Sequence, residues 1–278
     1  MKPVLGIAAY VLREAASRKF ILAFLVGITL VLAVVALSLR IEVIDGALAA
    51  TRLFGDVIPT SIRAVDVALR PVFKAAAFIV FYGGIVFGIV ACSDFAPGLL
   101  SPGRIEHLLA LPLRRWHLLA GTFLGVMTLA LGGTVYGAGG LTLIFGVKTG
   151  YWTLGPLIAG VLACVGFAAV YAVMLTTATF VRSAALCAAA GGLFLVGGII
   201  AGFRQQLSRF FEAGLGRNAF EAVTLLLPRL SALAMAAADL AASTPPQIRS
   251  LGLLLVGVFV FGLGALVVGF WRFEGKDY

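Results

Sequence analysis

Residues 116–147 read WHLLAGTFLGVMTLALGGTVYGAGGLTLIFGV, and this run holds no Asp, Glu, Lys or Arg between Arg115 and Lys148. A helix needs about 20 consecutive apolar residues to cross the hydrocarbon core of a bilayer. In lipid, a helix satisfies its own backbone hydrogen bonds, whereas an open sheet does not. The run therefore predicts a transmembrane helix.

Charge-free runs of similar length lie on both sides of this one. Together they predict six transmembrane helices, at 20–39, 72–92, 119–145, 156–180, 184–203 and 251–271. We therefore expect an all-α integral membrane protein, with residues 1–278 as a single transmembrane domain. The first span is expected to be a retained signal anchor. An even number of spans puts both termini on one side of the membrane.

The composition supports a membrane class and excludes several soluble ones. Of the 278 residues, 62% are hydrophobic and 12% are charged, and the mean hydropathy is +1.10. An ordinary soluble domain carries about 25% charged residues. A cytosolic enzyme, a DNA-binding protein and a disordered tail are therefore excluded. The 21 Lys and Arg against 12 Asp and Glu suggest contact with lipid headgroups and no nucleic-acid partner.

Glycines recur four residues apart within the predicted spans, a spacing that lets helices approach closely. The pairs are Gly84/Gly88, Gly121/Gly125, Gly133/Gly137 and Gly198/Gly202. With 34 glycines in the chain, some of these pairs are also expected by chance.

Three segments outside the spans have their own patterns. Residues 1–19 place Val, Ile, Leu and Ala on one helical stripe, which predicts an amphipathic helix on the membrane surface; a plain extension of the first span is the alternative. Residues 40–71 predict a folded, partly helical outer loop. Residues 204–250 predict a second outer loop that forms a helical cap.

The segment 93–118 is the most informative of the connections. A Ser-Pro-Gly turn at 101–103 precedes a predicted short helix at 104–111, which Pro112 ends. Such a helix between two spans suits docking into a groove of a soluble partner, and a passive surface loop is the equal alternative. Arg114 and Arg115 suit an anchoring role at interface depth.

The sequence predicts no catalytic, cofactor-binding or metal-binding residues. Cys92, Cys164 and Cys187 are dispersed, and the two histidines lack the spacing of a zinc site. No phosphate-binding GxxxxGK[ST] loop occurs, so the chain should not hydrolyse ATP itself. The predicted spans also lack ionisable residues beyond their edges, which argues against an ion-coupled transporter.

Two motifs resemble the membrane-spanning subunits of type-2 ABC transporters, most of which are exporters. The first is LREAASRK at 12–19, where these subunits carry a basic residue and Glu followed by a basic residue before the first span. The second is RIEHLLALPLRR at 104–115 with LLAGTFLG at 118–125, which is similar to Glu-x-Leu-Leu-(Ser/Ala)-x-Pro followed by Leu-x-Gly-Lys-x-x-Gly. Thr122 stands where the family often has Lys, so that basic anchor is missing.

The resemblance implies a cytoplasmic coupling helix that docks on a separate ATP-binding subunit, which would bind ATP and Mg. The residues implied in this docking are Arg13, Glu14, Arg104, Ile105, Glu106, Leu108, Leu109, Pro112, Arg114 and Arg115. It further implies cytoplasmic termini, the cytoplasmic (inner) membrane, and a homodimer or a pairing with a similar permease.

Two other functions remain compatible with the residues: a non-transporting membrane anchor or scaffold, and a passive facilitator. The polar groups available inside the spans are Ser, Thr and Tyr, such as Tyr82, Tyr136, Tyr171 and Thr176–Thr179. They suit lipid-like cargo as well as polymers or peptides.

Overall fold

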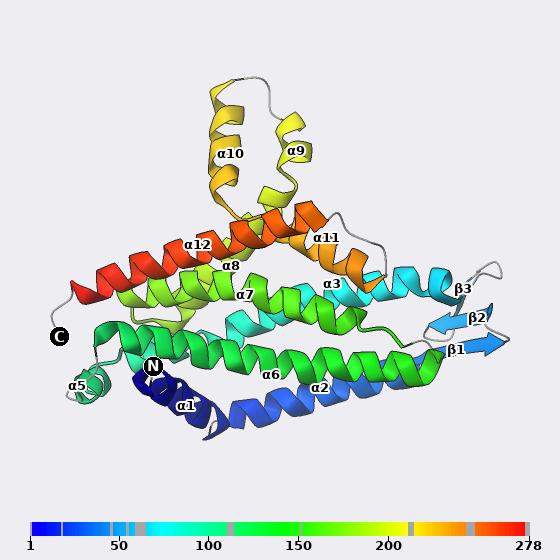
Figure 1. Ribbon diagram of the computed structural model, residues 1–278, viewed down its shortest axis with the longest axis horizontal. Helices are drawn as coiled ribbons and strands as arrows, with labels where there is room; N and C mark the ends of the chain where they lie inside the picture. The colour runs from blue at the N-terminus through cyan, green and yellow to red at the C-terminus, as the bar shows by residue number, and fades with distance from the viewer. Residues whose placement is uncertain are drawn as a thin grey trace.

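The computed structural model describes residues 2–17, 19–44, 47–53, 56–58, 65–109, 114–150, 152–210, 214–242 and 248–275. The long helices are α1 (Lys2–Ser17), α2 (Lys19–Ser38), α3 (Val65–Cys92), α6 (Arg115–Thr149), α7 (Gly155–Phe180), α8 (Ala184–Gly202) and α12 (Ile248–Glu274). The short helices are α4 (Phe95–Leu99), α5 (Arg104–Leu109), α9 (Arg204–Leu207), η1 (Ser208–Phe210), α10 (Leu215–Leu226) and α11 (Leu230–Ala241). Most of the long helices run side by side along the longest axis of the molecule (Figure 1).

The helices confirm most of the predicted spans. Within the described part of the chain, five stretches are long and apolar enough to cross a membrane: Arg70–Leu99, Arg115–Thr149, Gly155–Phe180, Ala184–Gly202 and Ser250–Glu274. The remaining prediction, 20–39, coincides with α2, whose described side chains form a shorter apolar helix from Phe24 to Leu37. The chain is therefore a multi-pass membrane protein whose membrane region is helical.

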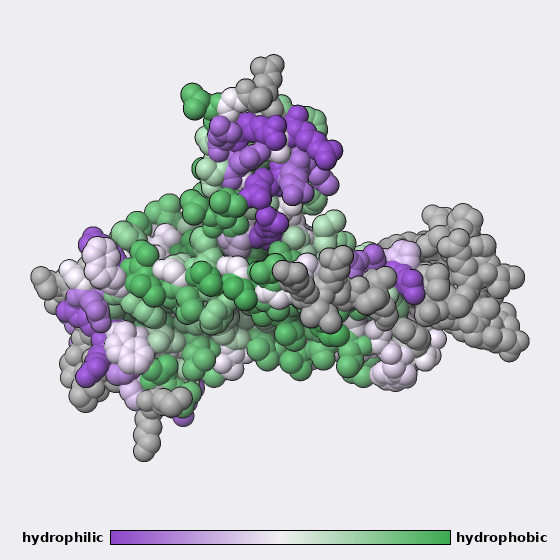
Figure 2. Space-filling view, turned by 45° about the horizontal axis from the view of Figure 1, so that its top comes forward, coloured by the Kyte–Doolittle hydropathy of each residue, from purple (hydrophilic) through white to green (hydrophobic). Residues whose placement is uncertain are grey.

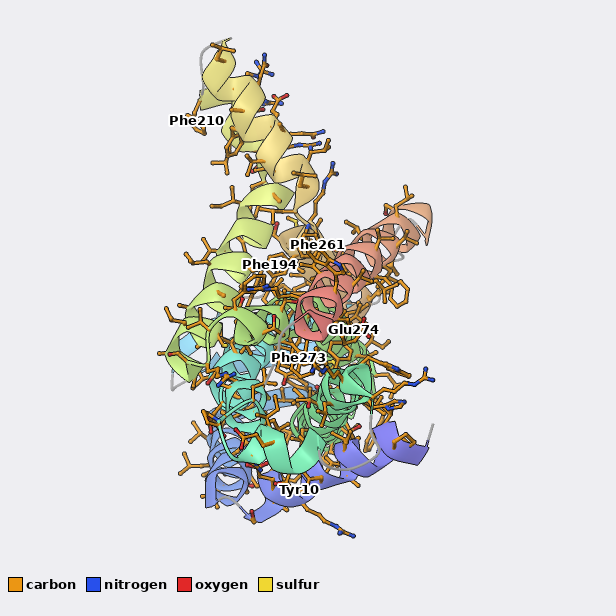
Figure 3. All side chains as sticks on the ribbon, turned by 90° about the vertical axis from the view of Figure 1, so that its left-hand side faces the viewer. Tyr10, Phe194, Phe210, Phe261, Phe273 and Glu274 are labelled. Carbon is orange, nitrogen blue, oxygen red and sulfur yellow. The ribbon has the colours of Figure 1, made fainter. Side chains whose placement is uncertain are left out.

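The core of the bundle lies around α7, which contacts α3, α6, α8, α11 and α12. Phe167, Tyr171 and Met174 on this helix are almost fully buried. The ring of Tyr171 lies 5.9 Å from that of Phe167 and 6.0 Å from that of Phe123 on α6. A second ring pair, Phe194 on α8 and Phe261 on α12, stacks at 4.8 Å (Figure 3). Aromatic packing thus joins the helices that surround α7.

In three of the four glycine pairs, both glycines lie against a neighbouring helix. These are Gly121/Gly125 against α1, Gly133/Gly137 against α2, and Gly198/Gly202 against the start of α11. In the fourth pair, Gly88 lies against the Phe167 ring, whereas a side chain at Gly84 would meet nothing within 4 Å. Most of these glycines therefore permit close packing, and the four-residue spacing alone does not identify every contact.

Helix α1 packs along α6 through its apolar stripe. Ile7, Val11 and Ala15 are buried there. A Cβ atom at Gly121 would lie 2.6 Å from Cβ of Ile7, and one at Gly125 would lie 2.9 Å from Cβ of Val11. The stripe that the sequence assigned to the membrane surface is therefore covered by α6. It looked like a lipid-facing stripe because both environments select the same apolar spacing.

The connection at 40–71 is helical from Val65, where α3 begins, and its first part contains strands that were not predicted. Three strands, Leu39–Ile44, Ala47–Leu53 and Asp56–Ile58, form an antiparallel sheet in the order β1-β2-β3. Leu39 pairs with Leu53, and Thr51 pairs with Ile58. The alternation of Leu, Ile and Val with Arg and Glu in β1 has the period of a strand, over a run too short to stand out in the sequence.

Helix α11 corrects the prediction that 204–250 is wholly an outer cap. It contacts α3, α7 and α8, and its buried residues include Leu230, Leu233 and Ala237. Helices α10 and α11 meet at a 57° bend, which is typical of a broken span or a re-entrant loop. The charge on α11 is paired, because Lys74 Nζ donates to Asp239 Oδ1 at 2.7 Å. Helix α11 therefore belongs to the bundle.

The close approach of α8 to α11 leads to a stability prediction. A Cβ atom at Gly202 would lie 1.8 Å from Ser231 Oγ, which donates a hydrogen bond to the Ile199 carbonyl at 3.0 Å. We expect Gly202→Val to lower the free energy of unfolding by about 2–3 kcal/mol, measured in detergent, because the contact is overpacked. Gly192→Val on the same helix meets nothing within 4 Å and is the control. Equal losses in both variants would contradict this packing.

Candidate partner-docking site

One end of the bundle brings together the segments that the sequence assigned to docking. We call it the α5 end; it comprises Tyr10–Ser17 of α1, helices α4 and α5, Arg114–His117, and Phe273–Gly275. Both chain termini lie near this end, and Figure 3 looks directly onto it. Hydrophilic side chains gather here, beside a hydrophobic band that covers the middle of the molecule (Figure 2).

Helix α5 begins where the sequence predicted. The Ser-Pro-Gly turn places Gly103 at φ 79°, a left-handed conformation that favours glycine, and the Ile105 amide donates to the Ser101 carbonyl at 3.1 Å. The helix is described from Arg104 to Leu109. Ile105 is 1% exposed, so it anchors α5 on the bundle and cannot contact a partner directly.

Arg104 and Glu14, both predicted to contact a partner, pair with each other. Arg104 Nη1 donates to Glu14 Oε1 at 3.1 Å, and Arg104 Nη2 donates to Glu14 Oε2 at 2.6 Å. The Arg104 guanidinium also donates to the hydroxyl of Tyr10 and lies 5.4 Å from its ring centre. This bidentate contact ties α5 to α1.

The contact with Glu14 and Tyr10 favours the charged form of Arg104. Partial burial opposes the charged form, but the hydrogen bonds to Glu14 and Tyr10 outweigh this effect and raise the pKa of Arg104 above its usual value. The guanidinium therefore stays charged throughout the physiological pH range.

Arg115 joins the start of α6 to the end of α12. Its Nη1 donates to the carbonyl oxygens of Phe273 at 3.5 Å and Glu274 at 3.1 Å. Carbonyls in the last turn of a helix lack partners within the helix, and a cation is favourable there. Arg115 was predicted as a docking residue, and the structure gives it this bracing contact inside the chain.

The outward surface of the α5 end carries exposed charges of both signs. Arg13, Glu106 and Arg114 are exposed. Beside them, the Arg114 amide donates to His117 Nδ1 at 3.1 Å and so caps α6. The side chains of Leu108 and Leu109, and the whole of Pro112, lie outside the described residues. Three of the predicted residues therefore remain available to a partner among those that the structure describes.

Three further features bear on chemistry within the described part of the chain. No group of three or more His, Cys, Asp or Glu residues is placed to hold a metal ion. The threonine hydroxyls of the 176–179 stretch are satisfied internally; for example, Thr176 Oγ1 donates to the Ala265 carbonyl at 2.7 Å. Tyr171 is fully buried, and its hydroxyl has no hydrogen-bond partner.

The ion pair between α1 and α5 leads to a second stability prediction. Arg104→Glu puts two carboxylates side by side, and we expect it to lower the free energy of unfolding by about 1–3 kcal/mol. The exchanged pair, Glu14→Arg with Arg104→Glu, should recover most of this loss. Thermal unfolding in detergent measures both. An exchanged pair no more stable than the single variant would contradict the contact.

Comparisons with known proteins do not assign a family. No protein-family model matches the chain, and no curated protein matches it.

Proposed function

We propose that the chain is the permease subunit of an ATP-driven type-2 ABC transporter and exports its substrate from the cytoplasm. The observation that carries the proposal is α5 itself, a short helix between two spanning helices that is tied to α1 by Arg104 and Glu14 and leaves Glu106 exposed. The resemblance of residues 12–19 and 104–125 to these permeases supports the same function.

The contacts around α5 suit the transmission of force. A push on α5 would reach α1 through the Arg104–Glu14 pair, and α6 through the close packing of α1 on Gly121 and Gly125. Arg115 then links α6 to α12. Closure of an ATPase beneath α5 would therefore move several spans together. A flexible loop without these contacts would absorb the movement.

A permease of this kind has a defined orientation, membrane and set of partners. The α5 end faces the cytoplasm, the membrane is the cytoplasmic (inner) membrane, and α1 lies at headgroup depth. ATP and Mg bind to the separate subunit, and two permease chains form the pathway, either as a homodimer or with a similar permease.

Two other functions compete with this one. A scaffold would anchor a soluble partner at the α5 end without transport. A passive facilitator would need no ATPase, and α5 would then be a surface loop.

Co-expression with each ATP-binding ABC subunit of the source genome, followed by purification and reconstitution in nanodiscs, separates the three. A stoichiometric complex whose ATP hydrolysis exceeds that of the ATPase alone, and which loses this stimulation with Leu109→Asp, is the expected result. A stable complex without stimulation would favour the scaffold. Failure to co-purify would favour the facilitator and overturn the proposal.

A further inference from the structure

A helical hairpin, α9–η1–α10, projects from the side of the bundle (Figures 1 and 3). We define it by residues Arg204–Phe210 and Leu215–Leu226. It follows α8 directly, and α10 lies across the direction of the long helices. Phe210, which is 84% exposed, marks its outer part.

The length of α8 sets the depth of this hairpin. Helix α8 has 19 residues, which at about 1.5 Å per residue extend for about 28 Å. The hydrocarbon core of a bilayer is about 30 Å thick. A helix of this length that enters the core near Ala184 therefore ends close to the opposite headgroups, and the long side chain of Arg204 can extend toward their phosphates.

The leaflet follows from where α8 begins. The Arg272 guanidinium on α12 lies 5.5 Å from the ring centre of Phe180, which ends α7 immediately before α8. Arg115 binds the end of the same α12 at the α5 end. Helix α8 therefore starts at the α5 end, and the hairpin lies in the opposite leaflet.

Helix α10 is amphipathic, and its apolar side is uncovered. Leu215, Val223 and Leu226 are 90%, 60% and 76% exposed, and they share one side of the helix. Thr224, on another side, is buried. An exposed apolar side on a helix that lies across the spans is typical of an interfacial helix whose apolar residues enter the acyl chains.

A basic cleft of about 580 Å³ lies between α9, η1 and α10. Its charged lining residues are Arg204, Arg209, Arg217 and Glu221. Arg217 Nε donates to Glu221 Oε1 at 3.0 Å, so this pair is neutral overall. Arg204 and Arg209 form no ion pair with any described residue. The cleft therefore presents, near the lipid headgroups, two guanidinium groups that have no ion-pair partner among the described residues.

From these observations we infer that the hairpin binds the phosphate of an anionic phospholipid, with Arg204 and Arg209 as its donors. Guanidinium groups donate paired hydrogen bonds to phosphate oxygens, and the positive charges of Arg204 and Arg209 favour a lipid with net negative charge. The apolar side of α10 would contact the acyl chains of the same leaflet. This inference does not depend on the proposed ATPase partner.

The test uses the purified, delipidated full chain and native mass spectrometry with added phosphatidylglycerol or phosphatidylcholine. Wild type is expected to bind phosphatidylglycerol more tightly than phosphatidylcholine. Arg204→Gln with Arg209→Gln should weaken phosphatidylglycerol binding about tenfold or more, because two charge-assisted hydrogen-bond donors are lost. Arg204→Lys with Arg209→Lys keeps the charge and should retain part of the affinity.

The matched control is Lys148→Gln with Arg229→Gln, which removes the same charge from exposed positions outside the cleft. It should bind phosphatidylglycerol as wild type does. Equal loss in the control and the cleft variant, or no loss in the cleft variant, would overturn the inference. Complete displacement of the lipid by inorganic phosphate would show a site for free phosphate and would overturn it as well.

Discussion

Gly125→Leu is expected to separate α1 from α6 and to lower the free energy of unfolding by about 3 kcal/mol or more. A Cβ atom at this position would already lie 2.9 Å from Cβ of Val11 and 3.1 Å from the Ala8 carbonyl oxygen. The larger leucine side chain cannot fit without moving α1, which would expose Ile7 and Val11. Thermal or denaturant unfolding in detergent measures the loss.

Gly132→Leu is the matched control, because it lies on the same helix and a side chain there would meet nothing within 4 Å. It should be neutral or slightly stabilising, since leucine favours helix over glycine by up to about 1 kcal/mol. A Gly125→Leu variant as stable as Gly132→Leu would show that α1 does not pack against α6 in this way.

Under the proposed function, Glu106→Arg is expected to weaken binding of an ATP-binding subunit about tenfold or more and to abolish most of its stimulated ATP hydrolysis. Glu106 is the exposed acid of α5, and Arg13 and Arg114 are exposed at the same end. Reversal replaces the exposed acid of α5 by a base, and a like charge placed opposite a basic residue of the partner costs several kcal/mol. Affinity is measured by titrating the ATPase onto the chain in nanodiscs.

Lys148→Glu provides the control for this variant. It reverses an exposed charge at the far end of α6, opposite the α5 end. ATPase binding and stimulation should match wild type. If Glu106→Arg binds as well as Lys148→Glu does, then α5 is not part of the docking surface.

The spanning helices were predictable because bilayer thickness fixes their length. The run between Arg115 and Lys148 became α6, although the helix extends over 35 residues, well beyond what a membrane requires. The search for long charge-free runs did not reveal that α11 belongs to the bundle. Arg229 and Asp239 interrupt its apolar run, and the pairing of Asp239 with Lys74 is a tertiary contact between residues 165 positions apart.

The four-residue glycine spacing predicted close helix–helix contacts, but it did not indicate which helix packs against each glycine pair. Gly121 and Gly125 were expected to let another helix approach closely, and the helix that does so is α1, which the sequence assigned to the membrane surface. Apolar periodicity reports that a face is covered. It does not report whether lipid or protein covers it.

The docking segment was predictable as an element but not in its internal contacts. The turn at Gly103 and the start of α5 follow from local chemistry. That Arg104 would meet Glu14, 90 positions away, depends on how α1 folds back onto α6. Opposite charges on two short segments beside the spans were the available signal, and the sequence assigned both to the same partner.

Cross-linking from α5 detects directly whether an ATP-binding subunit docks on this helix. Glu106→Cys, labelled with a thiol-reactive photo-cross-linker in membranes that contain the co-expressed ATP-binding subunit, should give a covalent adduct with that subunit. Lys148→Cys, labelled in the same way at the far end of α6, should give none. An adduct at position 106 that lacks the ATP-binding subunit, or equal adducts from both positions, would show that α5 is not the docking site for that subunit.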